Sequence, residues 1–135
     1  MKKFNKILIG THNKGKYKEL SFLITKKLKK ISPVNLKLKS PIESGKTFKA
    51  NSEIKAKYFF QKSKIVSISD DSGLAIESLK GNPGVNSARW AKKCGGFKKA
   101  MKKIISLVGN NTKAQFICSL TVQLTFQKKI TTLGV

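Results

Sequence analysis

The sequence is poor in acidic residues. Only six Asp and Glu stand against 29 Lys and Arg, which gives a formal net charge of +23 over 135 residues. Such a chain favours polyanionic partners, and nucleic acid is the first to consider. Arginine is scarce as well, because Arg89 is the only one. Proteins read bases and phosphates largely through bidentate arginine contacts, so nucleic acid is not the expected partner. A basic nucleic-acid-binding module is kept as an alternative function because of the net charge.

Cysteine and long apolar runs are also scarce. Cys94 and Cys118 belong to no CxxC or Cys/His cluster, so we expect reduced thiols, with neither a disulfide nor a zinc site. Cys118 lies in an apolar alternation and is expected in the core. No apolar run reaches membrane-spanning length, and the apolar residues near Phe4 are too few for a signal-peptide core. We therefore expect a cytoplasmic location and no membrane partner.

The length and the ordinary apolar share predict one domain, residues 1–135, with a modest core. Every second residue from Ala114 to Phe126 is apolar, which predicts a long strand with one buried face. The remaining periodicities predict strands at 4–9, 34–38, 65–68 and 130–135, and helices at 17–30, 49–62 and 97–108. This pattern predicts an α/β (mixed α+β) fold: a mixed central sheet with flanking helices and a long antiparallel hairpin.

Two of the six acidic residues, Asp70 and Asp71, are adjacent and follow the predicted strand 65–68. The carboxyl ends of strands gather ligands in open α/β sheets. Because neighbouring strand residues point to opposite faces, we expect one Asp to face a cleft and the other to brace the site. A carboxylate there suits Mg²⁺, which keeps water and substrate phosphate as its other ligands. The stretch ends in a predicted turn at Gly73, and an ordinary strand-end turn is the alternative interpretation.

The polar loop 10–16 lies between a predicted strand and a predicted helix. Backbone N–H groups and the helix dipole favour an anion at such a place, and Lys14 or Lys16 could reach it. The GxxxxGK[ST] spacing is absent, and many strand–helix loops have a similar composition. By themselves, Glu43 and Lys55 are interpreted as solvated surface residues, and Arg89 as a packed or ion-paired structural residue.

Four blocks of the sequence occur in a characteristic order. They are residues 11–16 with Glu19, residues 43–48 with Asn51 and Lys55, residues 70–74 with 79–85 and 87–91, and residues 116–120. The first is similar to T/S-G-N-x-x-K-x-x-E and the second to E-x-G-x-T-F-x-x-N-A-x-x-K-A. In this order the blocks resemble the Ham1/inosine-triphosphate pyrophosphatase family, hydrolases of non-standard purine nucleoside triphosphates. The resemblance implies a Ham1/Maf-like fold.

The resemblance also implies a role for each matching residue. Asp71 would be the catalytic base, and Glu43 and Asp71 would bind the cofactor Mg²⁺. Asp70 and Arg89 would support the site. The implied substrate contacts are Thr11, His12, Asn13, Lys14, Gly15, Lys16, Lys55 and Ser72.

The activity implied by the resemblance is hydrolysis of ITP, dITP and XTP to the monophosphate and pyrophosphate, by a homodimer. The sequence departs from the family in two ways. His12 stands where the family usually has Gly, and the C-terminal F-G-Y-D-P and S-H-R blocks do not occur. The expectation is therefore a domain that is incomplete at its C-terminus, and an inactive remnant that only binds triphosphate is a second alternative.

Overall fold

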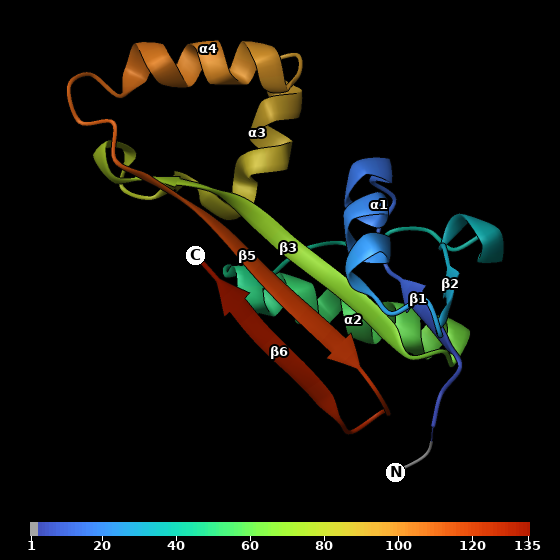
Figure 1. Ribbon diagram of the computed structural model, residues 1–135. Coiled ribbons are helices and arrows are strands. Elements are labelled where there is room, and N and C mark those ends of the chain that lie inside the picture. The colour runs from blue at the N-terminus through green and yellow to red at the C-terminus, as the bar shows by residue number, and fades with distance from the viewer. Residues whose placement is uncertain (1–2) are drawn as a thin grey trace. The chain divides into compact units, whose positions relative to one another are not determined.

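The computed structural model describes residues 3–135, which divide into two compact units (Figure 1). Unit 1 comprises residues 3–70 and 119–132, and unit 2 comprises residues 71–118 and 133–135. Three strands contribute residues to both units. The expectation of one domain over residues 1–135 stays a prediction.

The strands of the described chain form a six-stranded sheet in the order β2-β1-β3-β5-β6, with β4 paired to β3. Strand β1 is parallel to both β2 and β3, whereas β3 and β4 are antiparallel. The mixed α/β architecture expected from the sequence is thus confirmed. The elements are β1 (Lys6–Ile9), α1 (Lys14–Leu23), β2 (Lys29–Ile31), α2 (Phe48–Ser63), β3 (Ser67–Ile76), β4 (Asn82–Pro83), α3 (Ser87–Lys93), α4 (Phe97–Leu107), β5 (Ala114–Gln123) and β6 (Lys129–Gly134), with short 3₁₀ turns at Val34–Leu36, Glu77–Leu79 and Gly84–Asn86.

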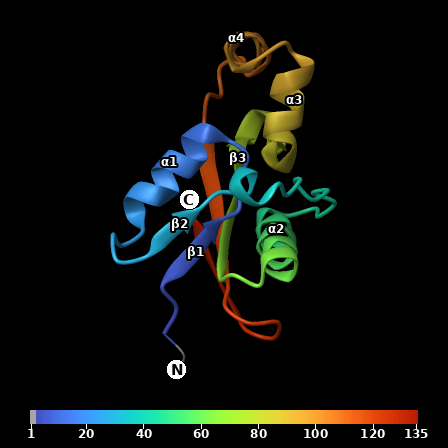
Figure 2. The same ribbon diagram turned by 90° about the vertical axis from the view of Figure 1, so that its right-hand side faces the viewer.

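The core of unit 1 is built on both faces of β1. Ile7 and Ile9 pack with Leu20 of α1, and Leu8 packs on the other face with Phe59 of α2. Figure 2 shows α1 and α2 on opposite sides of β1. A strand covered on both faces needs a continuous apolar run, which explains the Ile-Leu-Ile sequence of β1.

The first predicted helix, 17–30, is wrong at both ends. Helix α1 begins at Lys14, because Asn13 caps it by accepting a hydrogen bond from the backbone N–H of Lys16. It ends at Leu23, and the following residue, Ile24, is extended. Residues 29–31 instead form β2 and pair with β1. Sheet pairing has overridden the helical periodicity of this segment.

The predicted strand 34–38 is also wrong. Residues Val34–Leu36 form a 3₁₀ turn, which ends at Lys37 in a left-handed conformation with φ 54°. Side chains close this turn: the Asn35 amide oxygen accepts from the N–H of Ser32, and the Ser32 hydroxyl accepts from the N–H of Asn35. Such local side-chain bonds compete with strand pairing, and the apolar alternation did not reveal them.

The predicted turn at Gly73 is absent, because β3 runs unbroken from Ser67 to Ile76. Its second half, in unit 2, pairs with β4 through Ala75 and Pro83. The Leu74 N–H donates to the Ser87 hydroxyl at 3.0 Å. These partners keep the Asp-Ser-Gly stretch extended, although its composition is typical of turns.

Strand β5 is covered on both faces, whereas its apolar alternation predicts a single buried face. Leu120 and Val122 on the apolar face pack, partly buried, against the core cluster of Ile7, Ile9 and Leu20. Phe116 is exposed and Cys118 is only half-buried, whereas the polar Ser119 and Thr121 are buried. The hydroxyl of Ser52, on α2, hydrogen-bonds both of these side chains, at 2.8 and 2.9 Å. Buried hydroxyls are tolerated when they are bonded to one another, so this part of the interior of unit 1 is polar.

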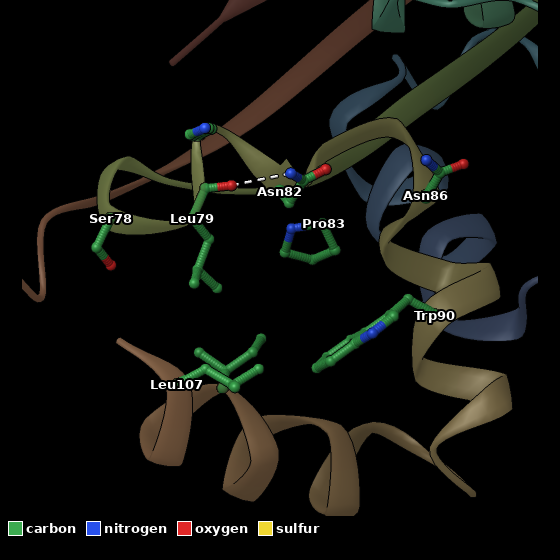
Figure 3. A pocket seen from close by; sticks show the side chains of 9 residues that line it. Ser78, Leu79, Asn82, Pro83, Asn86, Trp90 and Leu107 are labelled. Atoms are coloured by element: carbon green, nitrogen blue, oxygen red, sulfur yellow. Dashed lines mark hydrogen bonds between the residues drawn. The ribbon is translucent and has the colours of Figure 1, made fainter. Parts of the chain in front are cut away.

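Unit 2 contains α3 and α4 joined by a turn at Gly95 and Gly96, both of which have positive φ. Helix α4 follows the predicted helix 97–108 closely. A cavity of about 470 Å³ lies within the unit, and Figure 3 shows it between Leu79, Trp90 and Leu107. Within residues 3–135, no helix has both the length and the apolar character needed to cross a membrane.

Candidate functional site

The loop between β1 and α1 begins at a glycine that is required by packing. A Cβ at Gly10 would overlap the Ser69 hydroxyl and the Phe59 ring. The Ser69 hydroxyl donates to the Gly10 carbonyl at 3.0 Å, which links the end of β1 to β3. The loop is therefore fixed directly against the neighbouring strand.

The same loop then forms the N-terminus of α1. The Thr11 hydroxyl accepts from the N–H of Asn13 at 3.1 Å, and Asn13 caps the helix. Thr11 is buried, whereas Lys14 and Gly15 are exposed. A capped loop at a helix N-terminus presents backbone N–H groups and positive potential to an anion. The predicted substrate contacts of residues 11–16 are thus brought together on one short loop.

His12 anchors this loop to the chain segment after the 3₁₀ turn. Its Nε2 lies 2.8 Å from the Leu38 carbonyl, and its Nδ1 lies 2.6 Å from the Ser40 hydroxyl. A carbonyl can only accept, so Nε2 donates this hydrogen bond, while Nδ1 hydrogen-bonds the Ser40 hydroxyl. The histidine that departs from the family's usual glycine therefore makes specific contacts in unit 1.

Lys16 and Asp70 form an ion pair of 3.0 Å, between Nζ and Oδ2. Lys16 lies in the first turn of α1, and Asp70 lies in the part of β3 that belongs to unit 1. The carboxylate is buried while the lysine side chain is partly exposed. A buried carboxylate needs such compensation, so the pair fixes the lysine beside Asp70, which lies within β3 and not at the strand end that the sequence predicts.

Lys55 connects the predicted metal ligand Glu43 to the same strand. Its Nζ lies 3.1 Å from Glu43 Oε1 and donates to the Asp70 carbonyl at 2.8 Å. Lys55 is only 9% exposed, so it is not the surface lysine that its surroundings in the sequence indicate. Unit 1 thus brings Lys16, Asp70, Lys55 and Glu43 into one connected cluster.

Asn51 is a further residue of this region to which the sequence analysis assigned no role. It is fully buried on α2, and its Oδ1 accepts from the N–H of Gly45 at 2.7 Å. This bond holds the loop that carries Glu43 against the helix. A Cβ at Gly45 would overlap this amide oxygen. Asn51 lies one helical turn before Lys55, and that spacing is the one indication in the sequence that both face inward.

The remaining predicted site residues belong to unit 2. Asp71 is the first residue of that unit and is 5% exposed. Ser72 is half-buried, and Arg89 is exposed on α3. Asp70 and Asp71 are consecutive in β3, so their side chains leave the strand on opposite faces.

The donors of the predicted metal site fit Mg²⁺ by their chemistry. Across residues 3–135, no group of three or more His, Cys, Asp or Glu is arranged to hold a metal ion. Zinc sites commonly take three or four such ligands. Mg²⁺ instead takes one or two carboxylates together with water and substrate phosphates. Glu43 and Asp71 are oxygen donors of this kind.

The chain is thus a mixed α/β protein that has a lysine–carboxylate cluster beside the loop between its first strand and its first helix. The sequence profile of the Ham1 family matches residues 7–134. The chain belongs to the Ham1 family, as its resemblance indicated.

Individual relatives agree with this assignment. The dITP/XTP pyrophosphatase of Zymomonas mobilis is 37% identical over 123 residues, which are 87% of this chain and 59% of that protein. The dITP/XTP pyrophosphatase of Leptospira interrogans is 39% identical over 118 residues, covering 84% of this chain and 60% of that protein. The chain thus spans about 59% of the length of the first of these curated relatives.

Solved structures support the same fold. The structure of a HAM1 protein from Coxiella burnetii matches with a TM-score of 0.82 at 24% identity, over 97% of this chain and 70% of that one. The Ham1 protein of Staphylococcus aureus matches with a TM-score of 0.78 at 27% identity, over 96% of this chain and 68% of that one. The Ham1 fold is therefore present over nearly the whole length of this chain.

Proposed function

We propose that this chain hydrolyses non-canonical purine nucleoside triphosphates, namely ITP, dITP and XTP, to the monophosphate and pyrophosphate. The observation that carries the proposal is the cluster of Lys16, Asp70, Lys55 and Glu43 beside the loop 10–16. The names of the relatives, dITP/XTP pyrophosphatases, support the substrate class. Those names describe the longer proteins, and the activity of this chain is the proposal.

In this proposal the loop and two lysines bind the triphosphate. The N–H groups at the start of α1 and the ammonium groups of Lys16 and Lys55 would contact phosphate oxygens. Both lysines already lie at fixed positions because Asp70 and Glu43 pair with them. Such preorganised positive charge stabilises the negative charge that develops on the phosphate oxygens in the transition state.

Glu43 and Asp71 are the proposed ligands of Mg²⁺. When bound, this ion would neutralise charge on the phosphates and lower the barrier to attack by water. Asn51 would act as a positioning residue, because its bond to Gly45 fixes the loop of Glu43.

Asp71 is the proposed base for the attacking water. The water oxygen would bond to the α-phosphorus, the bond from that phosphorus to the bridging oxygen would break, and pyrophosphate would leave with that oxygen. The Asp71 carboxylate would accept the proton that the water releases. Because a carboxylate that also binds a cation is a weak base near neutral pH, orienting the water is its larger contribution. Asp70, Ser72 and Arg89 are proposed to support substrate and base.

A homodimeric assembly and a cytoplasmic location complete the proposal. The homodimer is implied by the family resemblance, and the cytoplasmic location is carried over as an expectation. Two alternatives remain distinct from it: a basic nucleic-acid-binding module, favoured by the net charge of +23, and a remnant that binds triphosphate without turnover.

Pyrophosphate release from ITP, XTP and ATP in the presence of Mg²⁺ tests the proposal. We expect turnover of ITP and XTP above ATP, and a loss of about a hundredfold or more in Asp71→Asn. Asp71→Asn keeps the shape of the side chain but removes its charge, and Glu77→Gln is the matched control in the same unit. Removal of Mg²⁺ by a chelator should abolish the activity of the parent chain.

The other outcomes separate the alternatives. Triphosphate binding without turnover, in a sample that is folded by circular dichroism, would favour the remnant. Tight, steeply salt-dependent binding to nucleic acid that survives Asp71→Asn, together with no turnover, would favour the nucleic-acid module. Equal slow turnover of all three nucleotides would support the proposed hydrolase activity but refute the proposed preference for ITP and XTP over ATP.

A further inference from the structure

Helix α4 of unit 2 carries an exposed apolar stripe. Phe97, Met101 and Ile105 are 64%, 56% and 72% exposed. They are spaced four residues apart, so they lie one above the other along one side of the helix. Scattered exposed apolar residues are ordinary, but three in a row on one helix face form a continuous surface.

The opposite edge of the same apolar face attaches α4 to unit 2. Ala100 is buried, and Ile104 and Leu107 line the cavity that Trp90 also lines (Figure 3). The helix is therefore held in place by one edge of its apolar face. The other edge, the stripe of Phe97, Met101 and Ile105, is exposed without the helix having to detach.

The charges around the stripe all have the same sign. Lys98 and Lys102 follow Phe97 and Met101 directly, and both are exposed on the side of the stripe away from Ala100. From Ser87 to Leu107 there are seven basic residues and no acidic one. An exposed apolar stripe bordered by lysines is complementary to a surface that is apolar inside and anionic at its rim.

We propose that α4 is a docking surface for anionic phospholipid membranes. Phe97, Met101 and Ile105 would insert at the level of the headgroups, and the neighbouring lysines would contact the lipid phosphates. Eleven residues are about half the length that spans a bilayer, so the helix would lie in the plane of the interface. The sequence has no apolar run long enough to span a membrane, and on that ground no membrane partner is expected from it. Binding to a membrane surface requires no such run, only an exposed amphipathic face.

Charge favours lipid over a second copy of the chain as the occupant. Two copies meeting through this stripe would bring Lys98 and Lys102 of each helix close to those of the other. No acidic residue lies between Ser87 and Leu107 that could offset this repulsion between lysines. An anionic membrane satisfies the apolar side chains and the lysines at once.

Flotation of the full chain with lipid vesicles tests the proposal. We expect binding to vesicles of phosphatidylcholine mixed with phosphatidylglycerol, and weak binding to phosphatidylcholine alone. The double variant Met101→Ser/Ile105→Ser should bind at least about tenfold more weakly, since each side chain loses apolar burial. The matched control is Phe22→Ser/Leu23→Ser on α1, which also replaces two exposed apolar residues and should bind as the parent does.

A second pair of variants separates local from overall charge. Lys98→Gln/Lys102→Gln and Lys26→Gln/Lys27→Gln have the same net charge, and all four lysines are exposed. The first pair should weaken vesicle binding several-fold more than the second. Equal weakening by both pairs would mean adsorption by overall charge and would overturn the proposal.

Trp90 provides a readout that is independent of flotation. It is the only tryptophan and lines the cavity with Ile104 and Leu107 of α4. Bound vesicles containing brominated lipid should quench its fluorescence, and Met101→Ser/Ile105→Ser should remove the quenching. Absence of quenching and of flotation would overturn the proposal. Self-association lost in this same variant, without vesicle binding, would instead assign the stripe to a second copy.

Discussion

The two units of the described chain differ in how much of their apolar and basic residues they bury. Unit 1 contains both buried apolar clusters, one beneath α1 and one beneath α2. It also buries polar groups that bond one another, such as Ser52 with Thr121 and Lys55 with the Asp70 carbonyl. Unit 2 instead exposes the stripe of α4 and seven basic side chains on and between its helices.

This difference indicates where sequence changes are costly. In the core of unit 1 a buried apolar or charged side chain is held by specific neighbours, and removing it leaves a cavity or an unmatched group. In the helices of unit 2 the same residue types are largely in water, where substitutions usually change stability by less than about 0.5 kcal/mol. Matched substitutions in the two units can therefore test the comparison directly.

The largest expected effect is that of Phe59→Ala in unit 1. Phe59 is 0% exposed and packs against Leu8. Its truncation should lower the free energy of unfolding by about 3–5 kcal/mol, measured by urea denaturation. Phe97→Ala in unit 2 removes the same ring from an exposed site and should cost less than about 1 kcal/mol. Equal losses would show that exposure does not distinguish the units.

A smaller effect is expected for the buried lysine. Lys55→Met keeps the aliphatic stem but removes the charge that pairs with Glu43 and the donor to the Asp70 carbonyl. We expect a loss of about 2 kcal/mol, discounted because Glu43 is partly exposed. Lys92→Met on α3 is the exposed counterpart and should be nearly neutral by the same denaturation. If Glu43→Gln rescued Lys55→Met, the loss would be due to an unpaired carboxylate.

The smallest effect concerns Glu53, on α2. Burial raises the pKa of its carboxyl, but hydrogen bonds from Lys129 and Thr131 and the charge of Lys129 outweigh burial and hold that pKa below its ordinary value of 4.5. The folded protein therefore binds this proton more weakly than the unfolded chain. Glu53 stabilises the fold above the unfolded pKa, and this contribution is lost as pH falls through the lower, folded pKa.

Glu53→Gln should consequently cost up to about 1 kcal/mol at neutral pH and nothing in strong acid. Urea denaturation of the parent and of Glu53→Gln, from neutral pH to strong acid, measures the difference in their free energies of unfolding. Glu77→Gln in unit 2 removes an exposed carboxylate and serves as control. A difference between parent and Glu53→Gln that persisted unchanged into acid would contradict the assignment to the ionised carboxylate.

Long periodic elements were predictable from the sequence, and short ones set by tertiary pairing were not. Helices α2 and α4 agree with prediction within about one residue because their apolar spacing and caps are local features. Residues 29–31 could not be assigned to β2 because their strand character comes from pairing with β1. The 3₁₀ turn at Val34–Leu36 depends on side-chain hydrogen bonds that an apolar pattern does not contain.

The residues of the candidate site were named from the family resemblance and their roles stay predictions, whereas the contacts among them could not be read from the sequence. The loop 10–16, Glu43, Lys55 and Asp70 were all identified by their order in the sequence. That Lys55 is buried and joins Glu43 to β3 depends on the position of α2 against the sheet. The contacts of Asn51 and His12 likewise depend on segments distant in the sequence.

The hydroxyl cluster of Ser52, Ser119 and Thr121 has a consequence for strand register. A slip of β5 by one residue would turn the apolar Leu120 and Val122 toward Ser52. The Ser52 hydroxyl would then lose its hydrogen bonds to Ser119 and Thr121. The same slip would take Leu120 and Val122 away from the core cluster of Ile7, Ile9 and Leu20 against which they pack. The hydroxyl bonds on one face of β5 and the apolar packing on its other face therefore specify the same alignment of the strand.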